Sequence, residues 1–147
     1  MSRIINTGDT AAKRRNRHMR SCAEVIRILA TRSGFDPEGM DMAAFLVFNL
    51  RDIYDTIEES AKAWDDKNYW KKAENLRQKW RWSHLSANRI EQLILTNRWD
   101  DITIELLELI PQFSSIKITS ITRDSDWWAG ALKALRRNAA ELEEQKK

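Results

Sequence analysis

The chain contains few side chains that could carry out catalysis or bind a metal ion. Its two histidines, His18 and His84, lie far apart in the sequence, and each has basic residues nearby that would repel a cation. No Glu-x-x-His motif of the kind that binds iron in helical bundles is present. We therefore predict no catalytic metal and no cofactor.

Cys22 is the only thiol of the chain, so an internal disulfide cannot form. It lies between Met19 and Ile26 at helical spacing, which favours a small, buried, apolar side chain over a nucleophile. The sequence also lacks a Gly-x-Ser-x-Gly motif, a P-loop and a Gly-x-Gly-x-x-Gly fingerprint. It therefore offers no convincing catalytic set.

Arg77 and His84 form one arrangement that has a catalytic counterpart. Six residues separate them, and on a helix they would share a face with Arg81. Their spacing resembles the Arg-x(4–6)-His signature of HEPN-type helical ribonucleases, although Gln78 follows the arginine where that family often has Asn. The resemblance covers only the segment from Arg77 to His84. It implies that Arg77 binds a phosphate and that His84 transfers protons, at a site shared by two chains.

A basic cluster near the start of the chain is the best candidate for binding nucleic acid. Its members are Lys13, Arg14, Arg15, Arg17 and Arg20. Such a cluster could neutralise phosphates along RNA or DNA. The alternative is a solvated helix end whose charge balances the acidic helix that follows.

Composition and charge favour one all-α domain over residues 1–147. With 4 glycines and 2 prolines, the chain has little turn chemistry for a β fold, and 147 residues can bury a sizeable core. Residues 1–35 and 67–99 each carry 8 basic and 2 acidic residues, whereas residues 36–66 carry 2 and 9. Antiparallel neighbours of opposite charge would attract, although each exposed pair contributes only ~0–1 kcal/mol.

Apolar residues at helical spacing predict a bundle of about five helices, with a long central helix near residues 67–97. We expect an Asp of Trp64-Asp65-Asp66 to cap it, and an Asp of Trp99-Asp100-Asp101 to cap the next helix. The long helix should bury one stripe: Tyr69, Ala73, Leu76, Trp80, Ser83, Ala87, Ile90 and Ile94.

The other helices are expected over these ranges: Asp9 or Thr10 to about Ser33, about Asp41 to Trp64, Ile102 to Ile110, and from Asp124 or Ser125 onward. The fourth should turn Leu106, Leu107 and Ile110 inward. The last should bury a stripe of Trp128, Leu132, Leu135, Ala139 and Leu142. Residues 112–122 should be an ordered loop, and residues 1–9 and 143–147 frayed ends.

Three large apolar side chains fall outside these stripes: Trp82, Leu85 and Trp127. Those that the bundle does not cover would form an apolar patch, which on a soluble protein usually marks an interface. Our leading hypothesis is therefore a non-enzymatic interaction module that self-associates, with a dimer favoured. A subunit that binds RNA or DNA through the basic first helix is the alternative, and a HEPN-like ribonuclease is the third hypothesis.

The chain also lacks the signals of a membrane or secreted protein. No apolar run approaches the ~18 residues that span a bilayer, and the basic start is not followed by a signal-peptide core. We therefore expect a cytoplasmic protein that binds neither a membrane nor a small molecule. The sequence does not indicate a pathway.

Overall fold

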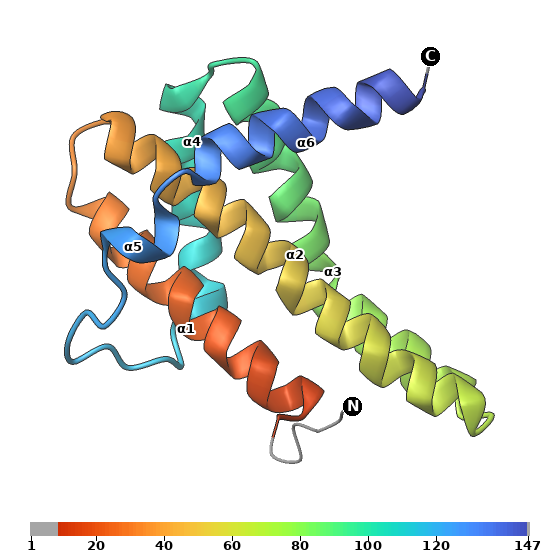
Figure 1. The fold of residues 1–147 in the computed structure, drawn as a ribbon. Helices are drawn as coiled ribbons and strands as arrows, with labels where there is room; N and C mark the ends of the chain where they lie inside the picture. Colours follow the sequence, from red (N-terminus) through yellow and green to blue (C-terminus); the bar gives the residue numbers. More distant parts are fainter. Residues whose placement is uncertain (1–8, 147) are drawn as a thin grey trace.

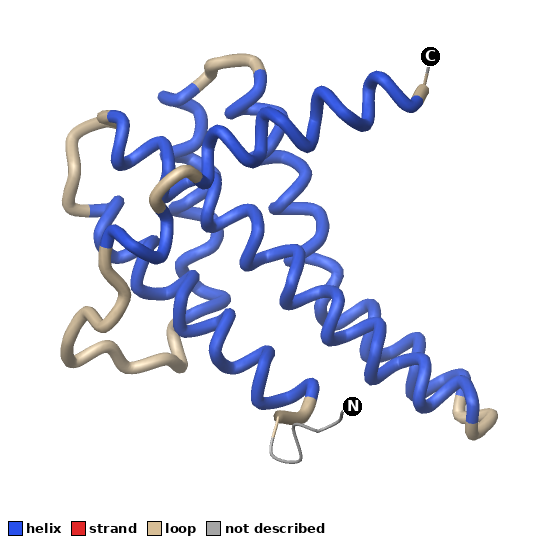
Figure 2. Tube along the Cα trace, in the orientation of Figure 1, coloured by secondary structure: helices blue, strands red, loops and turns tan. Residues whose placement is uncertain are grey.

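Helices make up all the regular structure in residues 9–146, the part of the chain that this computed structural model describes (Figure 2). Their order is α1 (Ala11–Ala30), α2 (Pro37–Asp66), α3 (Trp70–Leu95), α4 (Trp99–Leu109), the 3-10 helix η2 (Ile110–Phe113), α5 (Ser125–Trp128) and α6 (Ala131–Gln145). The predicted all-α bundle is confirmed. Residues 1–8, most of the segment predicted to fray, lie outside the described residues, as does residue 147.

The helix at the centre of the bundle is α2, and not the predicted one near residues 67–97. α1, α3, α5 and α6 all pack against α2, whereas α3 packs against α2 and α4 (Figure 1). Residues 42–48 of α2 are apolar on every side, so neighbours must cover α2 all round. Met42, Leu46 and Leu50 are accordingly fully buried.

α3 follows the predicted stripe along most of its length. Five small or aliphatic residues of the stripe are fully buried: Ala73, Ser83, Ala87, Ile90 and Ile94. The aromatic members differ from the prediction, because Trp80 is only half-buried and Tyr69 is 51% exposed. Trp80 packs against the edge of the core, with its ring centroid 5.9 Å from that of Trp82, and the guanidinium of Arg15 on α1 lies 5.5 Å from the Trp80 centroid.

An asparagine in the left-handed conformation lies in each of the two connections of α3, one to α2 and one to α4. Asn68 has φ 66° and Asn97 has φ 57°, which is the left-handed conformation that commonly follows a helix end. At the first connection, Tyr69 N–H donates to Trp64 O (2.9 Å) and Asn68 N–H donates to Asp65 O (2.9 Å). The Tyr69 and Trp64 rings also touch, with centroids 5.7 Å apart. These bonds and the ring contact form a Schellman motif, which satisfies the last carbonyls of α2.

The second connection repeats this geometry, with Arg98 N–H donating to Leu93 O (2.8 Å). The predicted Asp caps are therefore wrong. Tyr69 and Arg98 occupy the N-cap positions of α3 and α4, and neither makes a side-chain cap hydrogen bond. The aspartates lie elsewhere, because residues 65–66 end α2 and residues 100–101 form the first turn of α4.

The turn between α1 and α2 begins and ends earlier than predicted. α1 ends at Ala30, and α2 begins at Pro37. The carboxylate of Asp36 accepts a hydrogen bond from Gly39 N–H (2.7 Å), and the fixed φ of Pro37 suits the first turn of a helix. These residues therefore form the helix start that the sequence analysis placed about one turn later.

α4 turns a different face inward from the one predicted. Leu106 faces the core as expected, but Leu107 and Ile110 are 60% and 42% exposed. Ile102 and Leu109 are buried in their place. Within residues 9–146, α4 packs mainly on α3 and η2, and more lightly on α1, and these neighbours leave its outer side exposed. Apolar side chains therefore remain on the surface.

The predicted last helix is two helices, because Gly130 adopts φ 80° and separates α5 from α6. Leu135 is fully buried, and Trp128 nearly so. Leu142 is 58% exposed, contrary to prediction, because the second half of α6 extends away from the bundle (Figure 1). Residues 143–145 are helical rather than frayed.

A buried carboxylate attaches the loop between η2 and α5 to α1. Glu24 is fully buried. Its oxygens accept hydrogen bonds from Arg20 Nε (2.5 Å), Thr122 N–H (2.6 Å), Thr122 Oγ1 (2.7 Å) and Arg123 N–H (2.9 Å). Burial alone would raise the pKa of Glu24, but these donors outweigh burial and lower the pKa to about 2. The carboxylate is therefore ionised and fully hydrogen-bonded inside the fold.

Two arginines of α1 hold the same loop through its carbonyl groups. Arg20 donates to Lys117 O (3.2 Å) and Ser120 O (2.8 Å), and Arg27 donates to Ile118 O. The predicted ordered loop is thus residues 114–122, since residues 112 and 113 belong to η2.

The left-handed backbone at Asn68 can be tested by substitution. Asn68→Ala is expected to lower the free energy of unfolding by about 1 kcal/mol, because a Cβ that lacks a compensating polar group is strained at positive φ. Asn68→Gly should cost less than about 0.5 kcal/mol, since glycine adopts this conformation without steric clash. Urea unfolding followed by circular dichroism measures both values. Equal losses in the two variants would show that the amide side chain, and not φ, matters.

The Glu24 carboxylate should make stability depend on pH in acid. Its pKa is about 2 in the folded chain against an ordinary value of 4.5, so the unfolded state binds the proton more readily. Its stabilising effect is complete above about pH 5 and is lost as the pH falls towards 2, by about 3 kcal/mol for this group alone. Urea unfolding at a series of pH values measures the loss.

A pair of variants separates Glu24 from the other carboxyl groups. Glu24→Gln should remove most of this part of the pH dependence and destabilise the protein at neutral pH. Glu59→Gln, which changes an exposed carboxylate paired with Arg14, should leave the acid dependence nearly intact. The same pH dependence in Glu24→Gln as in the unmodified protein would contradict the assignment.

Candidate functional site

The structure does not bring Arg77 and His84 together. The guanidinium of Arg77 binds two carboxylates of α2, with Nε 3.1 Å from Glu58 Oε1 and Nη2 2.8 Å from Asp65 Oδ2. The ring of His84 instead lies against Tyr54, with centroids 5.2 Å apart. Burial raises the pKa of Tyr54 above its ordinary value. Both predicted residues attach α3 to α2, and the ribonuclease hypothesis gains no support from their geometry.

Most of the basic cluster of α1 is engaged within the protein. Arg14 Nη2 lies 2.7 Å from both carboxylate oxygens of Glu59. Arg15 donates to Thr56 Oγ1 (3.0 Å) and also covers the Trp80 ring. Through these contacts, the two arginines hold α1 against α2.

The other members of the cluster behave similarly. Arg17 pairs with Asp9 (2.8 Å), and Arg20 binds the buried Glu24, while Lys13 is exposed. Arg17 and Arg20 thus pair with acidic residues of their own segment, and the Arg14–Glu59 ion pair is the contact that supports a balance of charge with α2. Nucleic-acid binding by the cluster stays an untested prediction.

Cys22 and His18 are both accounted for by packing. Cys22 is fully buried, and burial raises the pKa of its thiol, with a smaller contribution from Asp52. Nδ1 of His18 lies 2.8 Å from Asn49 Oδ1. Within residues 9–146, no three His, Cys, Asp or Glu side chains lie together in a way that could hold a metal ion.

The three residues predicted as an interface lie in different surroundings. Trp82 is half-buried, with its ring against Phe113 of η2 at a centroid distance of 5.6 Å. Leu85 is 45% exposed on α3, and Trp127 is 50% exposed on α5. The guanidinium of Arg123 lies 4.6 Å from the Trp127 ring centroid. The second side of α3 at Trp82 is thus covered within the chain.

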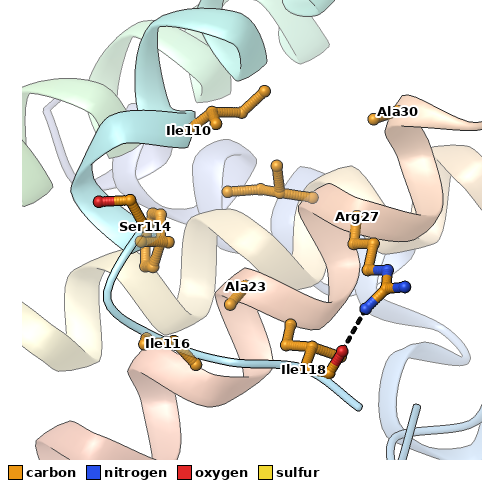
Figure 3. Close-up of a pocket in the computed structure, with 9 residues that line it drawn as sticks. Ala23, Arg27, Ala30, Ile110, Ser114, Ile116 and Ile118 are labelled. Atoms are coloured by element: carbon orange, nitrogen blue, oxygen red, sulfur yellow. Dashed lines mark hydrogen bonds between the residues drawn. The ribbon is translucent and has the colours of Figure 1, made fainter. Parts of the chain in front are cut away.

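A largely apolar groove runs between α1 and the segment formed by α4, η2 and the following loop (Figure 3). Its first pocket has a volume of about 290 Å³, and a second of about 100 Å³ continues it through shared residues. Its apolar lining includes Ala23, Ile26, Ala30, Ile110, Phe113 and Ile116. Arg27 also lines the groove, where it donates to the carbonyl of Ile118 (Figure 3).

A ridge of exposed apolar side chains lies beside the groove on α4 and η2. Ile104, Leu107 and Ile110 are 58%, 60% and 42% exposed, and they follow one another at a spacing of three. Leu107 and Ile110 also line the second pocket, so the ridge borders the groove directly. We call the groove and this ridge together the α4 surface.

Charges of both signs border the α4 surface. Asp100 and Glu108 are exposed and flank Ile104 at a spacing of four, which places them on the same side of α4. Arg27 lies across the groove on α1. The surface therefore has an acidic ridge and a basic groove wall, with apolar side chains between them.

The sequence analysis missed the α4 surface because it assigned Leu107 and Ile110 to the core. A usable signal was present, since residues 102–110 contain six apolar residues, more than one buried stripe can hold. Such a helix is either surrounded by neighbours or partly exposed. Only the packing decides between the two, and α4 has its main contacts with α3 and η2.

Comparison with protein-family models, with curated proteins and with solved structures finds no match to this chain. Among the described residues, none of the helices combines the length and the apolar character needed to cross a bilayer. Functional inference for this protein therefore starts from its own surfaces.

Proposed function

We propose that this protein is a non-enzymatic helical interaction module that forms a dimer through the α4 surface. The observation that supports it is the apolar ridge of α4 and η2, directly beside an apolar groove. Exposed apolar side chains that lie together usually mark an interface, whereas single ones are common on any protein surface. A cytoplasmic location, expected from the sequence, is part of the same proposal.

The partner is a second copy, because the α4 surface is complementary to itself. Ridge and groove lie side by side, so a two-fold axis between two copies places the ridge of each in the groove of the other. This reciprocity is the defining property of a two-fold interface. Leu107 would then fill a groove lined by small residues such as Ala23 and Ala30, as ridges fill grooves between packed helices.

Charge supports the same arrangement. If two α4 helices packed directly face to face, the carboxylates of Asp100 and Glu108 would lie against carboxylates of the other copy. Repulsion between these like charges is unfavourable. Ridge-into-groove packing instead directs these carboxylates towards Arg27 on α1 of the partner copy. Complementary charges of this kind fix the register of an interface more than they add affinity.

The dimer can be tested by light scattering on the purified chain. The unmodified protein is expected to show twice the mass of 17.3 kDa. Leu107→Glu should shift it to a folded monomer, because an unpaired carboxylate in the interface costs about 3 kcal/mol or more, which weakens association by ~100-fold. Circular dichroism of the variant checks that the helices remain.

Leu142→Glu is the matched control, since it makes the same substitution on a helix at nearly the same exposure, 58% against 60%. It should leave the dimer intact. Leu85→Glu tests the interface predicted from the sequence, and dissociation by this variant alone would move the contact to α3. A monomeric unmodified protein at high concentration would refute self-association.

A further inference from the structure

The end of the α2–α3 hairpin is a second exposed site, at the opposite end of α3 from α4. The 26 residues of α3 separate the two by about 39 Å at 1.5 Å per residue. α1 begins opposite Glu59, where Arg14 binds, so the hairpin beyond that point projects from the bundle (Figure 1). We call residues 62–72 the hairpin tip.

Two aromatic side chains of the hairpin tip face solvent. Trp70 is 68% exposed, more than any other large apolar side chain in the described part of the chain, and its neighbour Tyr69 is 51% exposed. Trp64 is half-buried against Tyr69. Because little of the Trp70 ring is buried, the fold gains little from this residue. A tryptophan held in water in this way is a candidate binding group.

The hairpin tip contains four exposed lysines: Lys62, Lys67, Lys71 and Lys72. The ammonium group of Lys72 lies 4.8 Å from the centroid of the Trp64 ring and 5.3 Å from that of Tyr69. The two acidic residues of the tip already have partners, since Asp65 binds Arg77 and Asp66 pairs with Lys62. The hairpin tip therefore combines exposed aromatic rings with a net positive charge.

We propose that the hairpin tip binds the surface of a membrane that carries anionic lipids. Tryptophan and tyrosine gather at the boundary between water and lipid, where an amphipathic ring is stable. Lysines close to an anionic leaflet are attracted to its headgroups, and their long stems let the charge stay at headgroup level. The composition of the tip matches these two requirements.

Shape and backbone favour a membrane over a nucleic-acid strand. A projecting end can press several of its side chains against a flat surface, whereas proteins that bind single strands follow the backbone with a groove. The backbone N–H groups of Lys67, Asn68 and Tyr69 all donate hydrogen bonds within the hairpin. The connection can therefore approach lipid without leaving these N–H groups unpaired. The tip would lie in the interface and not cross the bilayer, so the proposal departs from the sequence-based expectation of no membrane binding.

Cosedimentation of the full chain with lipid vesicles tests the proposal. The protein should sediment with vesicles of phosphatidylcholine and phosphatidylserine at low salt, and much less with phosphatidylcholine alone. Trp70→Ala should weaken binding about tenfold by removing an interfacial ring. The double variant Lys71→Gln, Lys72→Gln should weaken it about 25-fold, at roughly fivefold for each lysine near an anionic surface.

Matched controls lie elsewhere on the chain. Trp127→Ala removes a half-exposed tryptophan from α5, and Lys133→Gln removes an exposed lysine from α6; neither should change vesicle binding. No sedimentation with phosphatidylserine vesicles at low salt, or equal weakening by Trp127→Ala, would overturn the proposal. Binding of a labelled single-stranded oligonucleotide that depends on Trp70, without vesicle binding, would overturn it in favour of nucleic acid. The tip shares no residue with the α4 surface, so the dimer and the membrane contact can fail separately.

Discussion

The fold depends on covering one helix from all sides. The first half of α2 is apolar around its whole circumference, and Met42, Leu46 and Leu50 are fully buried there. A single neighbour covers only one side of a helix, so α1, α3, α5 and α6 are all needed around α2. The loop after η2 must then return along α1 so that α5 and α6 can reach α2. The hydrogen bonds of the buried Glu24 hold this loop in place. Within residues 9–146, α4 packs mainly on α3 and η2, and its outer side is left exposed.

Charged residues link the helices around that core, and these contacts engage most of the side chains that the sequence singled out as functional candidates. Arg14 binds Glu59, Arg77 binds Glu58 and Asp65, and Arg51 binds Glu91 at 2.7 Å. Each contact joins α2 to α1 or to α3. Partly exposed pairs of this kind add little stability individually, but they discriminate between alternative arrangements of the helices, because each segment opposes a segment of opposite charge. Side chains engaged in this way are poorly placed to bind a phosphate.

Two exposed surfaces that contain apolar or aromatic side chains remain available to a partner. The α4 surface consists of aliphatic side chains that the bundle does not cover, and the hairpin tip consists of aromatic rings beyond the reach of α1. The two surfaces differ in chemistry, since the first combines a groove with a ridge and the second is a projecting, lysine-rich end. A dimer that formed through the α4 surface would carry two hairpin tips. If both tips could reach one membrane, the second would bind at a raised effective concentration.

The sequence by itself determined which side chains lie on each face of a helix, and the tertiary structure decided which of those faces are covered. Helical period and composition predicted the all-α fold, the burial of Cys22 and most of the α3 stripe. They did not predict that Asn68 and Asn97 would end α2 and α3, because Asp was the stronger cap signal nearby and the left-handed geometry is a property of the turn. Nor could they predict that Leu106 is buried and Leu107 exposed, since either could lie on a buried face. Only the position of α4 beside α3 decides which of the two is covered. The exposure of the candidate surfaces could not be predicted for the same reason. Periodicity fixes the direction of each side chain around a single helix axis, whereas exposure depends on neighbours that lie far away in the sequence.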